Sequence, residues 1–268
     1  MSKDFLKTIL NEKIKEIAFA KEKMPKSILQ TKAQKMPSGS SLLKALRKPG
    51  PTGINIIAEI KRASPSKGDL KPNLDPVILA REYDIGKASA ISVLTDQKFF
   101  KGSLDDLRQA RQATSLPILR KEFIISSYQI YEAKVAEADS VLLIVRILND
   151  SQLSNFIKLC QDLKIDALVE VHSLEDLKRA TAAGAILIGI NNRNLSSFKT
   201  DIRLAGQLAS HLNSNQVAIA ASGITGQKDI QQNLKYNIFN FLIGESLVKA
   251  ENPANFLSLL LNSAKSAL

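Results

Sequence analysis

The sequence is poor in cysteine, histidine and aromatic residues, and it lacks any long hydrophobic run. Among 268 residues it has one cysteine (Cys160), two histidines (His172 and His211) and no tryptophan, and aromatic residues make up 5%. A single cysteine excludes an intramolecular disulfide framework and a zinc or iron–sulfur site built from several cysteines. Because no run of about 18 uncharged apolar residues occurs, the sequence predicts no membrane-spanning helix. We therefore expect neither a metal centre nor a membrane partner.

Acidic residues are scarce relative to basic ones. The sequence has 26 Asp and Glu against 37 Lys and Arg, a net charge of +11. Such a balance raises nucleic acid, a membrane surface or an anionic small molecule as partners. Residues 1–50 hold 12 of the basic and 4 of the acidic residues, a net of +8, which leaves +3 for residues 51–268. Most of the excess charge therefore belongs to the first fifth of the chain.

This basic segment is predicted to be a helical extension. Apolar residues recur at helical spacing with lysines between them: Phe5, Leu6, Ile9, Leu10, Ile14, Ile17 and Ala18. We interpret the lysines chiefly as a solvated helix face; a basic rim for an anionic substrate and a nucleic-acid contact are the alternatives. Nucleic-acid binding would need exposed aromatics among the lysines, whereas Phe5 and Phe19 fit the apolar stripe. No signal-peptide pattern follows the start, so we expect a cytoplasmic protein without a nucleic-acid partner.

From residue 54 onward, short apolar runs alternate with helical patterns. The runs are continuous, as expected for parallel strands covered on both faces, and span 54–60, 90–94, 117–119, 140–145, 167–171, 185–190, 217–220 and 239–243. Amphipathic stretches between and after them include 75–86, 127–138, 151–163, 173–183 and 253–267, with Ser151 and Ser173 as candidate N-caps. Eight such units predict an α/β fold, a (β/α)8 TIM barrel over 51–268, with the N-terminal helical extension over 1–50. A doubly wound open sheet is the alternative, weakened by the absence of a glycine-rich dinucleotide fingerprint.

Polar residues cluster where the predicted strands end, which is where barrel enzymes carry their chemistry. Glu59 and Lys61 are two residues apart and so share one strand face. Glu170 interrupts an apolar strand, where an unpaired carboxylate is costly. Lys121 follows the third strand. Carboxylates and lysines from three strands would meet at one mouth and support general acid–base chemistry.

The ends of the last two strands predict a phosphate site. Gly223 and Gly244 permit a close backbone approach at loops that lead into helices, and Ser64 offers a hydroxyl donor. The alternative is that these glycines are ordinary helix-entry turns. Arg193, near Asn191, could hold a substrate carboxylate in bidentate fashion, or form a salt bridge on the rim. His172, His211 and Cys160 show no catalytic pattern, and Cys160 is predicted to lie in the core.

Seven strand-end segments, in order, resemble the indole-3-glycerol-phosphate synthase family. They are IAEIKRASPSKG (57–68), SVLTDQKFFKGS (92–103), LPILRKEFI (116–124), LVEVHS (168–173), IGINNRNL (188–195), ASGI (221–224) and LIGES (242–246). Together they cover nearly the whole chain from residue 50, and the N-terminal segment resembles the extra helices of the family. The resemblance implies a TIM-barrel carboxy-lyase of tryptophan biosynthesis. Its reaction converts 1-(2-carboxyphenylamino)-1-deoxyribulose 5-phosphate to indole-3-glycerol phosphate, CO2 and water, without a cofactor.

The resemblance also implies residue roles. Lys121 matches the general acid of ring closure and Glu170 its partner carboxylate. The other catalytic or positioning matches are Glu59, Lys61, Asn191 and Ser222. The substrate-binding matches are Ser64, Gly223, Gly244 and Glu245 for the phosphate, Arg193 for a substrate-binding arginine, and Phe99 and Phe123 near the anthranilate ring. Glu245 is expected to turn its carboxylate away and to offer only its backbone N–H.

The sequence departs from the family pattern at one position, and one other enzyme family is an alternative. Ala221 stands where the family usually has a glutamate before Ser-Gly-Ile, so a carboxylate is missing at the rim. Phosphoribosylanthranilate isomerase, another phosphate-binding barrel, is the nearest alternative enzyme, but it needs a Cys/Asp pair, and Cys160 falls within a predicted helix. We expect a monomer whose only partner is a small substrate that carries a phosphate and a carboxylate.

Overall fold

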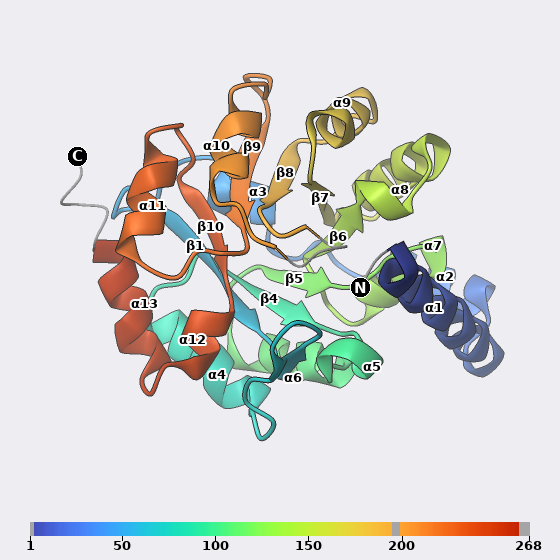
Figure 1. Ribbon diagram of the computed structural model, residues 1–268. Coiled ribbons are helices and arrows are strands. Elements are labelled where there is room, and N and C mark those ends of the chain that lie inside the picture. Colours follow the sequence, from blue (N-terminus) through green and yellow to red (C-terminus); the bar gives the residue numbers. More distant parts are fainter. Residues whose placement is uncertain (1–2, 195–198, 263–268) are drawn as a thin grey trace.

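Eight parallel strands close into a barrel in the computed structural model, which describes residues 3–194 and 199–262, with side chains from Phe5 onward (Figure 1). The order around the ring is β1-β10-β9-β8-β7-β6-β5-β4, and β1 pairs with both β10 and β4. This closure confirms the (β/α)8 prediction and excludes the open doubly wound sheet. The barrel strands are β1 Asn55–Ile60, β4 Ala90–Leu94, β5 Ile118–Lys121, β6 Ser140–Ile144, β7 Asp166–Val171, β8 Leu187–Asn191, β9 Val217–Ala221 and β10 Asn240–Ile243.

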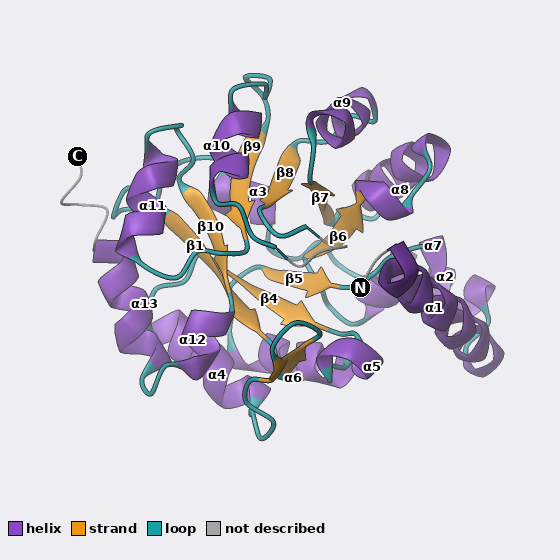
Figure 2. Cartoon of the chain, viewed as in Figure 1, coloured by secondary structure: helices purple, strands orange, loops and turns teal. Residues whose placement is uncertain are grey.

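Helices surround the strands on the outside of the ring (Figure 2). Three precede the barrel: α1 Lys3–Lys23, α2 Lys26–Lys35 and α3 Leu42–Leu46. The others are α4 Pro76–Ile85, α5 Gln97–Phe100, α6 Leu104–Ala113, α7 Ser127–Val135, the 3-10 turn η1 Val145–Ile147, α8 Asp150–Asp162, α9 Leu174–Ala182, α10 Arg203–Ala209, α11 Gln227–Leu234, α12 Glu245–Lys249 and α13 Pro253–Asn262. A short hairpin, β2 Ala63–Ser64 with β3 Gly68–Asp69, follows β1 and was not predicted.

The element boundaries differ from the predictions mainly at polar ends. Strand β5 continues to Lys121, because Lys121 still pairs with Leu94 in the barrel ladder. The predicted cap Ser173 is confirmed, since its side chain accepts a hydrogen bond from the backbone N–H of Asp176. Ser151 is wrong as a cap: α8 is capped by Asn149, whose side chain accepts from the N–H of Gln152. The last part of the predicted helix 253–267, residues 263–267, lies outside the described residues.

The N-terminal extension contacts both ends of the barrel. Helix α1 lies beside α7, where the Tyr128 hydroxyl donates to the Ala20 carbonyl at 2.9 Å (Figure 1). At the other end, the Asp166 carboxylate at the start of β7 accepts from the Ser41 hydroxyl and the Leu43 N–H, both at 2.9 Å. These bonds hold α3 under the barrel, and Leu42 and Leu46 complete the apolar interior. The extension is therefore part of the core packing of the barrel.

The solvated-face interpretation of the extension's lysines needs one correction. Lys13 is 1% exposed, and its ammonium lies 2.7 Å from both Glu16 and Asp96 and 3.1 Å from Glu122. Three residues assigned to the apolar stripe are exposed instead: Ile14, Ala18 and Phe19. The helix thus turns a lysine toward the barrel, because two carboxylates at the ends of β4 and β5 meet it there.

The core has two layers. Inside the ring, alternate strand residues such as Ile57, Leu119 and Leu168 form one apolar cluster, while the residues between them pack outward against the helices. Cys160 belongs to the outer layer, as predicted. Within the described residues, no helix is long and apolar enough to cross a membrane.

Candidate active site

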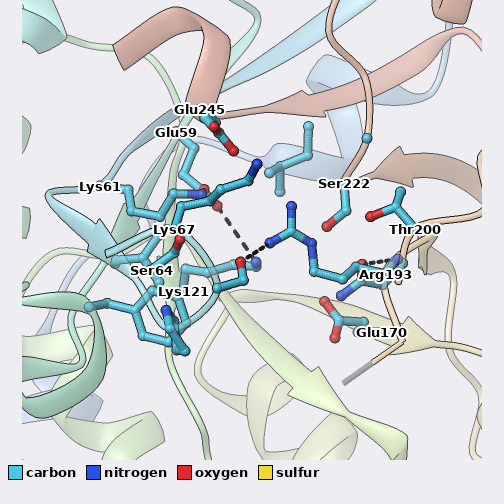
Figure 3. Close-up of a pocket in the computed structure, with 18 of the residues that line it drawn as sticks. Glu59, Lys61, Ser64, Lys67, Lys121, Glu170, Arg193, Thr200, Ser222 and Glu245 are labelled. Atoms are coloured by element: carbon cyan, nitrogen blue, oxygen red, sulfur yellow. Dashed lines mark hydrogen bonds and ion pairs between the residues drawn. The ribbon is translucent and has the colours of Figure 1, made fainter. Parts of the chain in front are cut away.

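A cavity of about 690 Å³ opens at the carboxyl ends of the strands (Figure 3). Its lining contains every predicted site residue except Phe99: Glu59, Lys61, Ser64, Lys121, Phe123, Glu170, Asn191, Arg193, Ser222, Gly223, Gly244 and Glu245. These residues come from six strands or the loops that follow them. Closure of the barrel brings these residues together, since the first and last of them lie almost 190 residues apart in the chain.

Glu59 lies between two lysines. Its carboxylate is 2.5 Å from the Lys61 ammonium through one oxygen and 3.6 Å from the Lys121 ammonium through the other. Burial by itself raises the pKa of Glu59, but the two lysines outweigh it, so the pKa of this carboxyl lies below its ordinary value. The charged carboxylate in turn stabilises both ammonium groups. The site therefore presents two proton donors held by one acceptor.

Glu170 approaches the cavity from the opposite part of the ring. It is buried on β7, opposite Gly189 of β8 and Ile144 of β6 in the strand ladder. His172 follows on the same face, with its Nε2 atom 3.4 Å from Glu170 Oε1. Figure 3 shows Glu170 and Lys121 directed into the same space. A carboxylate and an ammonium on two sides of one cavity can exchange protons with a substrate held between them.

The Arg193 guanidinium extends into the cavity and is held by the loop after β1. Its Nη1 donates to the Ser66 hydroxyl at 2.6 Å, and its backbone N–H donates to Asn191 Oδ1 at 3.0 Å. The buried Nε has no hydrogen-bond partner within residues 3–194 and 199–262. An N–H donor left open in a polar cavity is available to an acidic ligand. Ser66 was missed by the sequence reasoning, because 127 residues separate it from Arg193.

Ser222 and Ser246 bring hydroxyl groups to the cavity at the ends of β9 and β10. Ser222 and Gly223 both have positive φ, 64° and 78°, which turns the chain sharply at the cavity. A side chain at Gly223 would collide with Thr200, so the loops approach closely there. Ser246 lines the same region, and its buried hydroxyl has no hydrogen-bond partner. These donors suit an anionic group.

Glu245 lines the cavity, but its carboxylate bonds back to its own helix. It accepts from Lys249 at 2.8 Å, and this hydrogen bond is the main reason that the pKa of Glu245 lies below its ordinary value. The negative charge is thereby compensated without a ligand. That only the backbone of Glu245 faces the phosphate therefore stays a prediction.

The apolar wall differs from the prediction at one position. Phe123 lines the cavity, but Phe99 packs edge-on against Phe5 with ring centroids 5.5 Å apart, and Phe100 lines the cavity in its place. Helix α1 adds Phe5, Leu6 and Ile9 to the lining. Their spacing in the sequence predicted only an apolar stripe on a helix, and no neighbouring motif indicated that this stripe borders the site.

Metal and cysteine chemistry find no support in the described part of the chain. Its His, Cys, Asp and Glu side chains form no group of three or more that could hold a metal ion. Cys160 is buried in α8, and burial raises the pKa of its thiol well above the ordinary value. A protonated thiol in the outer core cannot serve as the acid–base cysteine that the isomerase alternative requires.

A closed parallel barrel with two carboxylates, two lysines and open anion donors at its mouth defines a (β/α)8-barrel enzyme of general acid–base chemistry. Comparison with known proteins narrows this class. The family model described as "Indole-3-glycerol phosphate synthase" matches residues 6–260. The chain belongs to the indole-3-glycerol phosphate synthase family.

Individual relatives agree with that assignment. A protein named indole-3-glycerol phosphate synthase from Desulfosudis oleivorans is 51% identical, over 97% of this chain and 99% of its own length. One of the same name from Syntrophobacter fumaroxidans is 49% identical, over 96% of this chain and 97% of its own. Among solved structures, thiamine phosphate pyrophosphorylase from Pyrococcus furiosus superposes with a TM-score of 0.60 at 16% identity, over 80% of this chain and 97% of that one. That likeness shows the barrel fold alone.

Proposed function

We propose that this cavity performs the indole-3-glycerol phosphate synthase reaction with Lys121 as the general acid and Glu170 as its partner carboxylate. The substrate is 1-(2-carboxyphenylamino)-1-deoxyribulose 5-phosphate, and the products are indole-3-glycerol phosphate, CO2 and water. The observation that carries the assignment is the placement of the Lys121 ammonium beside Glu59 on one side of the cavity, with Glu170 entering from β7.

Ring closure needs an acid at the ketone oxygen. The aromatic ring carbon that bears the carboxylate attacks the ketone carbon, and the developing alkoxide takes a proton from the Lys121 ammonium. The pKa of the Glu59 carboxyl lies below its ordinary value, so an ionised carboxylate lies beside that ammonium and compensates its charge. Lys61, on the other oxygen of Glu59, supplies a second ammonium.

The later steps need no electron sink. Loss of CO2 from the ring carbon that attacked the ketone restores the aromatic ring, and the electrons of the broken C–C bond return to that ring. Dehydration then requires an acid at the departing hydroxyl and a base for the last proton, and we assign these transfers to Glu170 with the two lysines. Asn191 and Ser222 border this space and position the substrate. We therefore propose a reaction without a cofactor.

Different parts of the cavity hold the phosphate, the carboxylate and the aromatic ring of the substrate. The phosphate is held by the loops of Gly223 and Gly244 together with Ser64, and the unpartnered Ser246 hydroxyl adds a donor. Arg193 holds the carboxylate through its open N–H. The anthranilate ring packs on Phe123 and Phe100. We retain Phe99 as a support of this wall through its contact with Phe5.

The enzyme is further proposed to act as a cytoplasmic monomer without a nucleic-acid partner. Every group used above comes from one chain, so catalysis requires no second copy. Sedimentation at micromolar concentration should give the chain mass of 29.3 kDa. A stable dimer would contradict the monomer assignment and leave the chemistry as proposed.

The direct test is turnover of the purified protein with the carboxyphenylamino sugar phosphate, followed by indole fluorescence. We expect Lys121→Ala to lower kcat by at least about 100-fold with an unchanged circular dichroism spectrum, because a general acid contributes about 10² to 10⁴ in rate. Lys178→Ala, at an exposed lysine of α9, is the matched control and should turn over normally. Normal turnover by Lys121→Ala would remove Lys121 from the acid role.

A further inference from the structure

His172 is buried beside Glu170 and is not used by the chemistry above. It follows β7 on the face that carries Glu170, since residues two apart on a strand point the same way. Its side chain is 2% exposed, and its Nε2 lies 3.4 Å from Glu170 Oε1. Among the residues that the structure describes, neither ring nitrogen has a hydrogen-bond partner. Buried polar atoms are nearly always paired, so this imidazole calls for an explanation.

The backbone around His172 is held firmly. Its N–H donates to the Asp176 carboxylate at 2.9 Å, and the same oxygen accepts from Arg146 Nε at 2.9 Å. The imidazole also borders a second hollow on the side of β8, lined by Asn191 and Asn192. The ring is therefore placed between Glu170 and that hollow by fixed backbone contacts.

Burial favours the neutral form of the ring, while the charged groups around it act in both directions. Burial is the largest influence and lowers the pKa of His172 below its ordinary value, although Glu170 opposes it. The other charged groups facing it come from every neighbouring element: Lys121 of β5, Arg146 of η1, Asp176 of α9, and Lys199, Asp201 and Arg203 at the second hollow. Two of the nearer ones, Arg146 and Lys121, also disfavour a charged imidazole.

We propose that His172 is a positioning residue for Glu170, whose carboxylate it holds through an Nε2–H donor. This inference rests on the proposed role of Glu170. A 3.4 Å separation is long for a hydrogen bond, but catalytic hydrogen bonds in unliganded sites often shorten when the substrate binds. A neutral donor favours the ionised carboxylate, so it keeps Glu170 ready to accept a proton. It also fixes which Glu170 oxygen faces the substrate.

The first test compares His172→Phe with His172→Gln by the pH profile of kcat. We expect His172→Phe to lower kcat by about tenfold with KM changed less than twofold. Its acidic limb should also move relative to that of the wild type, because Glu170 loses the N–H group that holds its carboxylate. His172→Gln, which keeps an N–H donor, should recover much of the rate and the limb. His211→Phe, at the other histidine, is exposed and should behave as wild type.

The second test needs no turnover. With only two histidines in the sequence, ¹⁵N imidazole spectra should show two side chains. We expect His172 to remain neutral at pH values below the ordinary pKa of a histidine, and Glu170→Gln to shift the signals of His172 and leave those of His211. Turnover by Glu170→Gln would refute the role of Glu170, while the spectra still report the contact.

Three results would overturn the proposal. One is a wild-type rate and pH profile in His172→Phe. Another is an equal loss in His172→Phe and His172→Gln with an unmoved limb, which indicates packing alone. The third is a His172 signal that is insensitive to Glu170→Gln. If His172→Phe does not fold, the glutamine variant and the spectra still decide between these outcomes.

Discussion

At the residue scale, the geometry of the site depends on its small residues as much as on its charged ones. Gly244 lies where any Cβ atom would meet the Glu59 carboxylate and, at 3.1 Å, the Lys61 ammonium. Ala221 leaves a small apolar side chain in the barrel interior, next to Leu242 in the ladder, at the position where the family resemblance implies a glutamate. The two lysines consequently share Glu59 as their nearest carboxylate.

Gly244→Ala tests this dependence on space. The added methyl group would displace the Glu59–Lys61 pair, so we expect kcat to fall by about tenfold or more while the free energy of unfolding changes by about 1 kcal/mol. Steady-state kinetics and urea unfolding measure the two quantities. Gly184→Ala is a useful comparison, because its added methyl meets no atom within 4 Å and it lies away from the cavity, although its positive φ costs some stability. Equal kinetics in the two variants would contradict the steric explanation.

At the element scale, helix α1 is joined to the catalytic mouth by a buried ionic cluster. Lys13 reaches Asp96 after β4 and Glu122 after β5. Asp96 also caps α5 by accepting from the N–H groups of Phe99 and Phe100, and Glu122 directly follows Lys121. The cluster therefore holds the helix that supplies the apolar wall of the cavity to the strands that supply its chemistry.

Lys13→Met should destabilise the fold by about 3 kcal/mol or more, because it leaves buried carboxylates without their cation. The pKa of Lys13 lies above its ordinary value, since the nearby carboxylates outweigh the burial that lowers it. Its stabilisation is thus complete below about pH 10.5 and is lost as the pH rises through the folded-state pKa. Urea unfolding at pH 7 and at higher pH measures this.

The control for this experiment is Lys15→Met, two residues away on the exposed side of α1. It should change the unfolding free energy by less than about 0.5 kcal/mol. A comparable loss in both variants would mean that helix propensity, and not the ionic cluster, is responsible.

At the scale of the whole molecule, the net charge of +11 is distributed in two ways. The extension carries most of the excess, and lysines such as Lys7, Lys15 and Lys21 are exposed. The barrel has nearly equal numbers of acidic and basic residues, and a few of its basic side chains, such as Lys67, line one cavity. An anionic substrate is attracted most by charges within about a Debye length of the site.

We expect replacement of Lys7, Lys15 and Lys21 by glutamine to change kcat/KM less than twofold at low ionic strength. Lys67→Gln alone should lower it severalfold there and much less at about 0.5 M salt, where screening is short-ranged. A large effect of the triple replacement would instead support the basic-rim interpretation of the extension.

What the sequence by itself determined is local and periodic. Continuous apolar runs indicated eight buried parallel strands, and strand parity put Glu59 and Lys61 on one inward face. The roles of the site residues came from ordered motifs.

Contacts between distant segments were decided only by the tertiary structure. Lys13 becomes buried because β4 and β5 each end in a carboxylate beneath α1. Phe100 lines the cavity in place of Phe99 because the Phe99 ring packs against Phe5. The Arg193–Ser66 hydrogen bond and the Glu59–Lys121 ion pair form because the closed barrel joins strands that are far apart in the chain. Local patterns show which way a side chain points from its strand, and only the closed barrel determines what it meets.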